Sequence, residues 1–135
     1  METIFTKIIA REIPAEIVYE DDIVLAFLDI SPVNHGHTLV IPKSPFINAF
    51  DAEPEVFAHM HKVGLKIAQA LKNAGLAEGI NMVTNNGAAA GQEVFHSHLH
   101  IIPRKTGDQS FTKPKHVATN SEELSKTKEL LQSHL

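Results

Sequence analysis

The sequence predicts a single α+β domain with a five-stranded antiparallel sheet, one long helix, a short N-terminal helix and a C-terminal helix. Five short apolar segments bounded by turn residues are typical of strands, and one longer segment repeats apolar residues at helical spacing. Their order, with a hairpin and one long crossover, favours an antiparallel sheet. We expect the 135 residues to form one domain, with a core over residues 3–105 and a loop and helix over residues 106–135.

The first half of the chain is predicted to hold a short helix and three strands. Residues 3–11 form an amphipathic pattern, and we expect Pro14 to end this helix because proline disrupts helical hydrogen bonding. Residues 17–19 and 23–28 are rich in branched apolar residues and flank an acidic turn, which predicts a hairpin. Residues 37–42 follow a polar loop and form the third predicted strand.

The second half begins with the long helix. Its apolar stripe consists of Val56, Met60, Val63, Ile67 and Leu71. Pro54 suits the first turn, Asp51 is a candidate cap, and Gly75 stands where a left-handed residue is expected after the helix. Residues 80–84 form a fourth predicted strand, and the fifth carries a cluster of histidines. Asn120 and the glutamate three residues later resemble a capping box, which opens a terminal helix.

Composition excludes several classes of protein. The chain has 12 basic and 16 acidic residues, and its net charge of −4 argues against a nucleic-acid-binding protein. It has no cysteine, which excludes disulfides and thiolate metal sites and fits a cytoplasmic location. We expect no signal peptide, because Met1 is followed by Glu2 and not by a basic and apolar leader. No apolar run is long enough to predict a membrane span.

His96, His98 and His100 alternate along one short segment. On a strand, residues two apart share a face, so the pattern predicts three imidazoles in a row. A core-facing strand would carry branched aliphatic residues there, and three neighbouring imidazoles are expected to shift one another's pKa. The segment therefore predicts chemistry on that face of the sheet. The remaining histidines are expected to be solvated, namely His35, His59, His61, His116 and His134.

The residues alone leave two kinds of site open. Three histidines can hold a catalytic zinc ion, or they can act directly as nucleophile and acid. The small-residue loop over residues 87–91 precedes the histidines, and such a loop lets backbone N–H groups approach an anion closely. A phosphate delivered to imidazoles favours direct attack on phosphorus, because imidazole is a competent nucleophile.

Residues 91–104 resemble the motif of the histidine triad (HIT) family, His-φ-His-φ-His-φ-φ with φ apolar. Residues 4–9, 26–32 and 36–43 are similar to further segments of the same family, so the likeness covers about 105 residues. The resemblance implies the HIT-like fold and a homodimer with one continuous ten-stranded sheet. It also implies a hydrolase or transferase that attacks the α-phosphate of a purine nucleotide through a nucleotidyl-histidine.

The resemblance assigns a role to particular positions of this chain. His98 matches the nucleophile, His100 the residue beside the phosphate and leaving group, His96 a supporting histidine, and His37 a fourth histidine that buttresses the triad. Asp29 matches the carboxylate that accepts both ribose hydroxyls. The apolar pocket around base and sugar corresponds to Ile4, Phe5, Ile13, Phe27 and Ile30. The phosphate loop corresponds to Asn85, Gly91, Gln92, Glu93 and Val94.

No cofactor or metal is expected. Some bacterial members hold a structural zinc ion with two N-terminal cysteines, and Thr3 and Thr6 stand at those places. The family contains a branch that cleaves nucleoside phosphoramidates, giving AMP-like products, and a branch that cleaves dinucleoside polyphosphates. The chain lacks the tryptophan typical of the first and has the Pro103-Arg104-Lys105 segment of the second, a combination that resembles bacterial members. A non-catalytic nucleotide-binding scaffold and a zinc protein are the alternatives from other classes.

Overall fold

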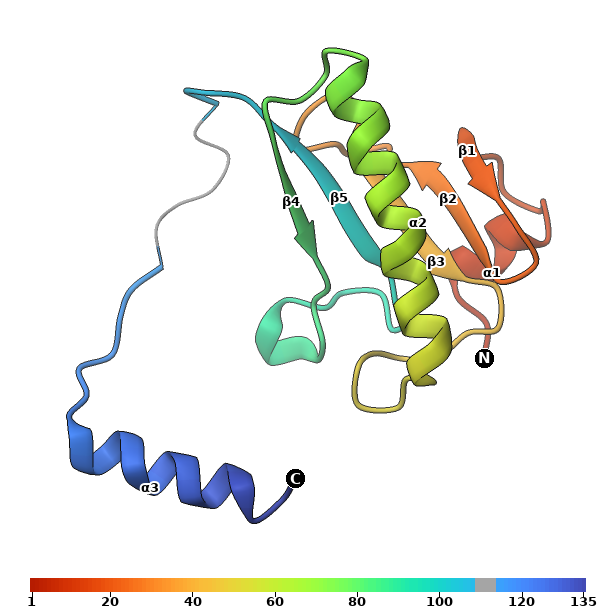
Figure 1. The fold of residues 1–135 in the computed structure, drawn as a ribbon. Coiled ribbons are helices and arrows are strands. Elements are labelled where there is room, and N and C mark those ends of the chain that lie inside the picture. Colours follow the sequence, from red (N-terminus) through yellow and green to blue (C-terminus); the bar gives the residue numbers. More distant parts are fainter. Residues whose placement is uncertain (109–113) are drawn as a thin grey trace.

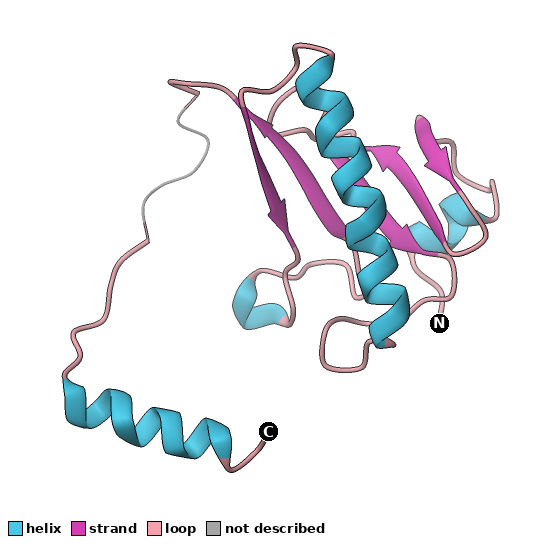
Figure 2. Ribbon diagram, viewed as in Figure 1, coloured by secondary structure: helices cyan, strands magenta, loops and turns pink. Residues whose placement is uncertain are grey.

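A computed structural model describes residues 1–108 and 114–135. Its elements are α1 (Ile4–Ile9), β1 (Ile17–Glu20), β2 (Val24–Leu28), β3 (Thr38–Pro42), α2 (Pro54–Asn73), β4 (Gly79–Val83), the 3₁₀ turn η1 (Ala88–Ala90), β5 (Leu99–Arg104) and α3 (Ser121–Gln132). The strands form one sheet in the order β1-β2-β3-β5-β4, with every neighbouring pair antiparallel (Figures 1 and 2). The predicted fold class is therefore confirmed, and the first four strands lie within one residue of their predicted limits.

The two faces of the sheet are buried by different helices. Side chains alternate along β2 and β3, so Val24, Ala26 and Val40 belong to the core beneath α2. Leu25 and Leu39 point to the opposite face. There they pack with Phe5 and Ile8 of α1, in a second core that also contains Phe27 and Ile41. Figure 1 shows α2 crossing one face of the sheet, while the short α1 lies at the β1–β2 end. The rest of the α1 face stays open to hold a site.

Two predicted helix ends need correction, and one is confirmed. Arg11 adopts a left-handed conformation with φ 63° directly after the C-cap, so α1 ends before Pro14 can act on it. Asp51 does not cap α2, because its carboxylate instead accepts hydrogen bonds from the backbone N–H groups of Ile47 and Asn48. Gly75 has φ 76° after the last turn of α2, as predicted.

The histidine segment is only partly a strand, contrary to the sequence prediction. β5 begins at Leu99, so His100 lies on the strand while His96 and His98 precede it. The backbone N–H of Ser97 donates to the carbonyl of Phe46 at 2.8 Å, outside the sheet ladder. This bond bends the approach to β5 and sets the direction of the histidine side chains.

His59 is half-buried and bonded, and the expectation that it is solvated is wrong. Its Nε2 lies 2.7 Å from Oδ2 of Asp21, and this contact fastens α2 to the β1–β2 turn. Burial alone would raise the pKa of Asp21, but hydrogen bonds from His59, Val24 and Tyr19 hold it well below its usual range.

The C-terminal helix forms as predicted but is not part of the core. Asn120 accepts a hydrogen bond from the backbone N–H of Glu123, which is the expected N-cap. Every residue of α3 is exposed, and Figure 1 shows the helix lying apart from the sheet. Within residues 1–108 and 114–135, no helix is long and apolar enough to cross a membrane.

Candidate active site

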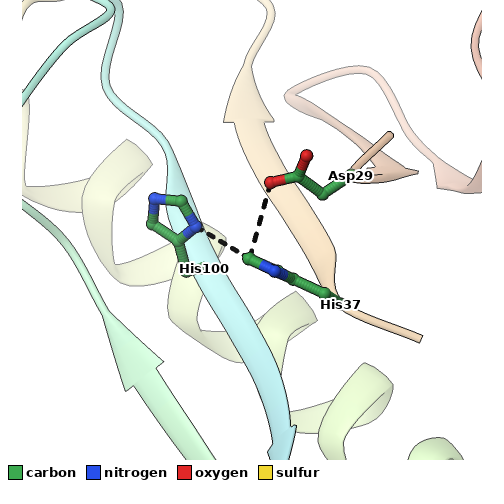
Figure 3. Close-up of side chains that lie close together, drawn as sticks. All are labelled: Asp29, His37 and His100. Carbon is green, nitrogen blue, oxygen red and sulfur yellow. Dashed lines mark hydrogen bonds and ion pairs between the residues drawn. The ribbon is translucent and has the colours of Figure 1, made fainter. Parts of the chain in front are cut away.

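The candidate site lies where three neighbouring strands bring polar side chains together. Asp29 directly follows β2, His37 directly precedes β3, and His100 lies in β5. Leu28 pairs with Thr38 and Leu39 pairs with His100, so the antiparallel register places the three side chains at adjoining strand ends. Figure 3 shows them converging, with His37 between the other two. The structure thus brings together three residues that the sequence assigned to the site.

Hydrogen bonds fix the protonation pattern of the two imidazoles. The backbone N–H of Val33 donates to Nδ1 of His37 at 3.1 Å, so the proton of neutral His37 is on Nε2. This Nε2 lies 2.9 Å from Nδ1 of His100 and 3.7 Å from Oδ2 of Asp29. Because Nδ1 of His100 accepts, the proton of neutral His100 is on Nε2. His37 therefore orients His100 and determines its tautomer.

His98 is held in the complementary tautomer. Its Nδ1 lies 2.7 Å from the backbone carbonyl of His96, and a carbonyl can only accept, so Nδ1 carries the proton. The lone pair of Nε2 is then available for nucleophilic attack. The ring packs against Phe5, with centroids 5.0 Å apart, and against His100, with centroids 4.9 Å apart.

His96 has a different surrounding from the other two. It is completely buried, its Nε2 donates to the carbonyl of Pro42 at 3.0 Å, and its Nδ1 lies 3.0 Å from the hydroxyl of Thr3. The Thr3 oxygen also caps α1 by accepting from Phe5 and another backbone N–H. His96 thus ties the start of α1 to the end of β3. The predicted row of three equivalent imidazoles is wrong, because this ring is enclosed.

Burial keeps the histidines of the site neutral. Burial, together with the neighbouring His98 and His37, lowers the pKa of His100 to about 4. Burial also lowers the pKa of His98 and of His37, while the negative charge of Asp29 opposes the change in both. At neutral pH the site therefore presents one lone pair on His98 and one N–H donor on His100, without repulsion between charged rings.

The groups that lie close enough to hold a metal ion differ from those of the zinc alternative. Among the described residues, Asp29, His37 and His100 offer ligand atoms within 4.8 Å of one another. The set that the sequence offered for zinc, His96 with His98 and His100, is not brought together, because both nitrogens of His96 are engaged with Pro42 and Thr3. Within this set, Nε2 of His37 and Nδ1 of His100 are already joined by a direct hydrogen bond.

The residues expected around base and sugar divide into three groups. Phe5 and Phe27 are buried with their rings edge to face at 5.7 Å. Ile13 lines the margin of that core and also a hollow of about 390 Å³ beside α1, which Ile4 lines as well. Ile30 is 93% exposed and covers nothing in this structure. Phe5 and Phe27 are therefore part of the closed core, Ile4 and Ile13 line an adjacent hollow, and Ile30 is open to solvent.

Asp29 uses its two carboxylate oxygens differently. Its Oδ1 accepts from the backbone N–H of Ser31 at 2.8 Å, which fixes the turn after β2. Its Oδ2 faces Nε2 of His37. A carboxylate has lone pairs for further donors on both oxygens, so the turn contact leaves room for hydroxyl groups.

The phosphate loop is held in shape by the side chain of Gln92. This buried amide accepts from Asn48 and from the backbone N–H of Gly87, and it donates to the carbonyls of Ile47 and Val94. The side chain is thereby saturated, and the backbone N–H of Gln92 donates to the carbonyl of Gly87 at 3.1 Å. Sequence reasoning missed Asn48, since nothing local connects it with a residue 44 positions away.

The rest of the loop is open. Gly87 and Gly91 have φ of 96° and 90°, conformations that a glycine adopts without strain, and the 3₁₀ turn η1 lies between them. Glu93 is exposed, while Asn85 and Val94 are half-buried. Val94 packs on the core beneath Phe5. The loop thus precedes the histidine segment with backbone that can approach a ligand.

These features define a site with an imidazole whose Nε2 carries a lone pair, a second imidazole oriented by His37, and a small-residue loop. The chain belongs to the HIT family, since the family model for the HIT domain matches residues 10–107. A crystal structure of a HIT family protein from Bacillus subtilis is 41% identical, with 98% of this chain and 96% of that chain covered and a TM-score of 0.89.

Two further relatives carry more specific names. The histidine triad nucleotide-binding protein of Candida albicans is 32% identical, with 98% of this chain and 96% of that chain covered and a TM-score of 0.87. Adenylylsulfatase HINT3 of Arabidopsis thaliana is 44% identical over 107 residues, which are 79% of this chain and 54% of the relative.

Proposed function

We propose that the protein is a nucleotidyl hydrolase or transferase that attacks the α-phosphate of a purine nucleotide, with nucleoside phosphoramidates as substrates. The observation that carries the proposal is the bond from Nδ1–H of His98 to the carbonyl of His96 at 2.7 Å. It supplies a fixed imidazole whose Nε2 lone pair is free at neutral pH. Such a group is a ready nucleophile toward phosphorus, and a covalent intermediate divides one difficult displacement into two easier ones.

In the first step, Nε2 of His98 forms a bond to the α-phosphorus, and the bond from phosphorus to the leaving nitrogen breaks. The electron pair stays with the leaving nitrogen, which needs a proton. An anionic phosphate beside His100 favours the imidazolium, so substrate binding raises its pKa from about 4. Nδ1 of His100 then takes up a proton from solvent and no longer accepts from Nε2–H of His37. Nε2–H of His100 then protonates the leaving group.

In the second step, water attacks the nucleotidyl-histidine. The water loses a proton to Nε2 of His100, the bond between phosphorus and His98 breaks, and its electron pair returns to Nε2 of His98. Nucleoside monophosphate leaves, and with AMP derivatives this product is AMP. In the site before substrate binds, His37 orients His100 through its hydrogen bond to Nδ1.

Binding of the nucleotide is assigned to the groups around this centre. We expect the backbone N–H groups of Glu93 and Val94 to hold the phosphate where the small-residue loop ends, because those of Gly91 and Gln92 already donate to carbonyls of the loop. Asp29 is proposed to accept the ribose hydroxyls, and Phe5, Ile13 and Phe27 to form the floor beneath the base. Ile30 is proposed to close over the base from the solvent side.

Three other functions compete with this proposal. Dinucleoside polyphosphates place a P–O–P bond at the same phosphorus. Adenylyl sulfate places a P–O–S bond there, and the name of the Arabidopsis relative favours testing it. A non-catalytic nucleotide-binding scaffold would use the same pocket without turnover. The three leaving groups differ mainly in their need for protonation, which is greatest for nitrogen.

We also propose that the protein forms a homodimer in the cytoplasm. β4 is an outer strand of the sheet, and an unpaired edge favours pairing with a second chain. Leu65 of α2 and Met82 of β4 are 53% and 40% exposed. Joining two β4 edges would bury them and extend the sheet to ten strands.

The test is a side-by-side turnover assay in chelator with adenosine phosphoramidate, diadenosine polyphosphate and adenylyl sulfate. We expect the phosphoramidate to be cleaved fastest, and His98→Ala to abolish turnover while nucleotide affinity stays within about tenfold. His134→Ala, at the exposed end of the chain, is the matched control. Near wild-type turnover by His98→Ala would refute the mechanism, and activity that requires added zinc would favour a metalloenzyme instead.

A further inference from the structure

The terminal helix α3 carries an apolar stripe with no apolar cover. Leu124, Leu130 and Leu131 are each about 60% exposed. Leu124 and Leu131 are seven positions apart and share a helix face, with Leu130 at its border. A helix of 12 residues is marginal in water without tertiary packing. The stripe therefore indicates a docking surface for α3 on some protein body.

α3 lies apart from the sheet of its own chain. Figure 1 shows the helix apart from the sheet, on the side of β4. Residues 1–108 are 108 of the 135 residues, so a match confined to them could not exceed a TM-score of about 0.8. The Bacillus subtilis crystal structure matches 98% of the chain with a TM-score of 0.89. The crystallised relative therefore places its terminal segment much as this chain places α3.

An apolar groove of suitable size lies on the opposite side of α2. It has a volume of about 610 Å³ and lies between the C-terminal half of α2 and the ends of β1, β2 and β3. Its lining is mostly apolar and includes Val18, Leu28, Ile67, Ala70, Leu71 and Leu76. The rim carries Lys66. A groove of this kind takes the apolar face of an amphipathic helix.

We propose that α3 of one copy docks in this groove of a second copy of the chain. The groove lies on the β1 side of α2 and α3 lies on the β4 side (Figure 1), so α3 is across the sheet from its own groove and can meet the groove of another molecule. The exchange is reciprocal, with two copies of α3 filling two grooves under one two-fold axis. The acidic first turn of α3, with Glu122 and Glu123, complements Lys66 at the rim.

The test uses single cysteines in the full chain, which has none of its own. Ala70→Cys marks the groove, Leu131→Cys marks the apolar stripe of α3, and Glu129→Cys on the opposite face of that helix is the control. All three positions are exposed, so the fold should tolerate them. Two single-cysteine variants are mixed, allowed to exchange subunits, treated with a short bismaleimide, and resolved on a denaturing gel.

We expect the mixture of Leu131→Cys and Ala70→Cys to give a two-chain product at least tenfold faster than the mixture of Glu129→Cys and Ala70→Cys. Equal rates for the two mixtures, or no product in either, would overturn the proposal. A double variant with both Ala70→Cys and Leu131→Cys tests whether α3 docks in the groove of its own chain. Cross-linking only within one chain would show that α3 reaches its own groove, which also overturns the proposal.

Discussion

Because His100 is neutral in the folded protein, the free energy of unfolding should depend on pH. Its pKa is about 4 in the folded protein and near 6.5 in an unfolded chain, so the unfolded state binds more protons between these two values. Stability is fully present above pH 6.5 and falls as the pH drops toward 4. Each pKa unit corresponds to about 1.4 kcal/mol, so the difference of about 2.5 between the two values removes roughly 3 kcal/mol between pH 7 and pH 4.

Replacement of this one residue should remove that part of the pH dependence. His100→Gln keeps an acceptor for Nε2–H of His37 but cannot be protonated in this range. Urea denaturation at a fixed protein concentration should show that wild type loses roughly 3 kcal/mol more than the variant between pH 7 and pH 4. Acidic residues titrate alike in both proteins and cancel in the comparison.

His134→Gln is the matched control for the loss of a histidine, because His134 lies in the exposed C-terminal segment. Its curve should follow that of wild type. Parallel curves for wild type and His100→Gln would show that His100 is readily protonated in the folded protein. The proposed division between a donor on His100 and a lone pair on His98 would then be refuted.

Two further predictions concern the scaffold of the site. Thr3→Val removes the cap of α1 and leaves Nδ1 of buried His96 without a donor, so denaturation should show a loss of roughly 2–4 kcal/mol. Thr6→Val should cost less, because its hydroxyl bonds only the backbone N–H and carbonyl of Thr3, and equal losses would contradict the link to His96. Gly64→Val should cost about 1–3 kcal/mol in the same measurement, because its Cβ would lie within 3.0 Å of side chains from β4 and β5, while Gly79→Ala, which meets no atom within 4 Å, should be near neutral.

Local patterns in the sequence were sufficient for the framework. The predicted strands at residues 23–28 and 37–42 place Asp29 directly after one strand and His37 at the start of the next, and the structure has the same strands to within one residue. The pairing of neighbouring strands then brings these ends to His100. Such predictions succeed because period and order determine which side chains can share a face.

The features that local sequence does not predict depend on contacts between distant segments. His96 fits the alternating pattern, yet it turns inward because Pro42 and Thr3 supply an acceptor and a donor for its ring. Gln92 resembles a phosphate ligand, but Asn48 and three backbone groups occupy its amide. Asp51 precedes α2 as a helix cap would, but its carboxylate bonds the preceding loop instead. None of these partners is visible from local sequence.

The stereochemistry at phosphorus tests the central claim most directly. A substrate made chiral at the α-phosphorus by sulfur is cleaved in isotopically labelled water, and the configuration of the product is determined. Attack by His98 followed by attack of water gives two inversions, so the account predicts net retention. Inversion would show a single displacement by water, and it would contradict a nucleotidyl-histidine intermediate at His98.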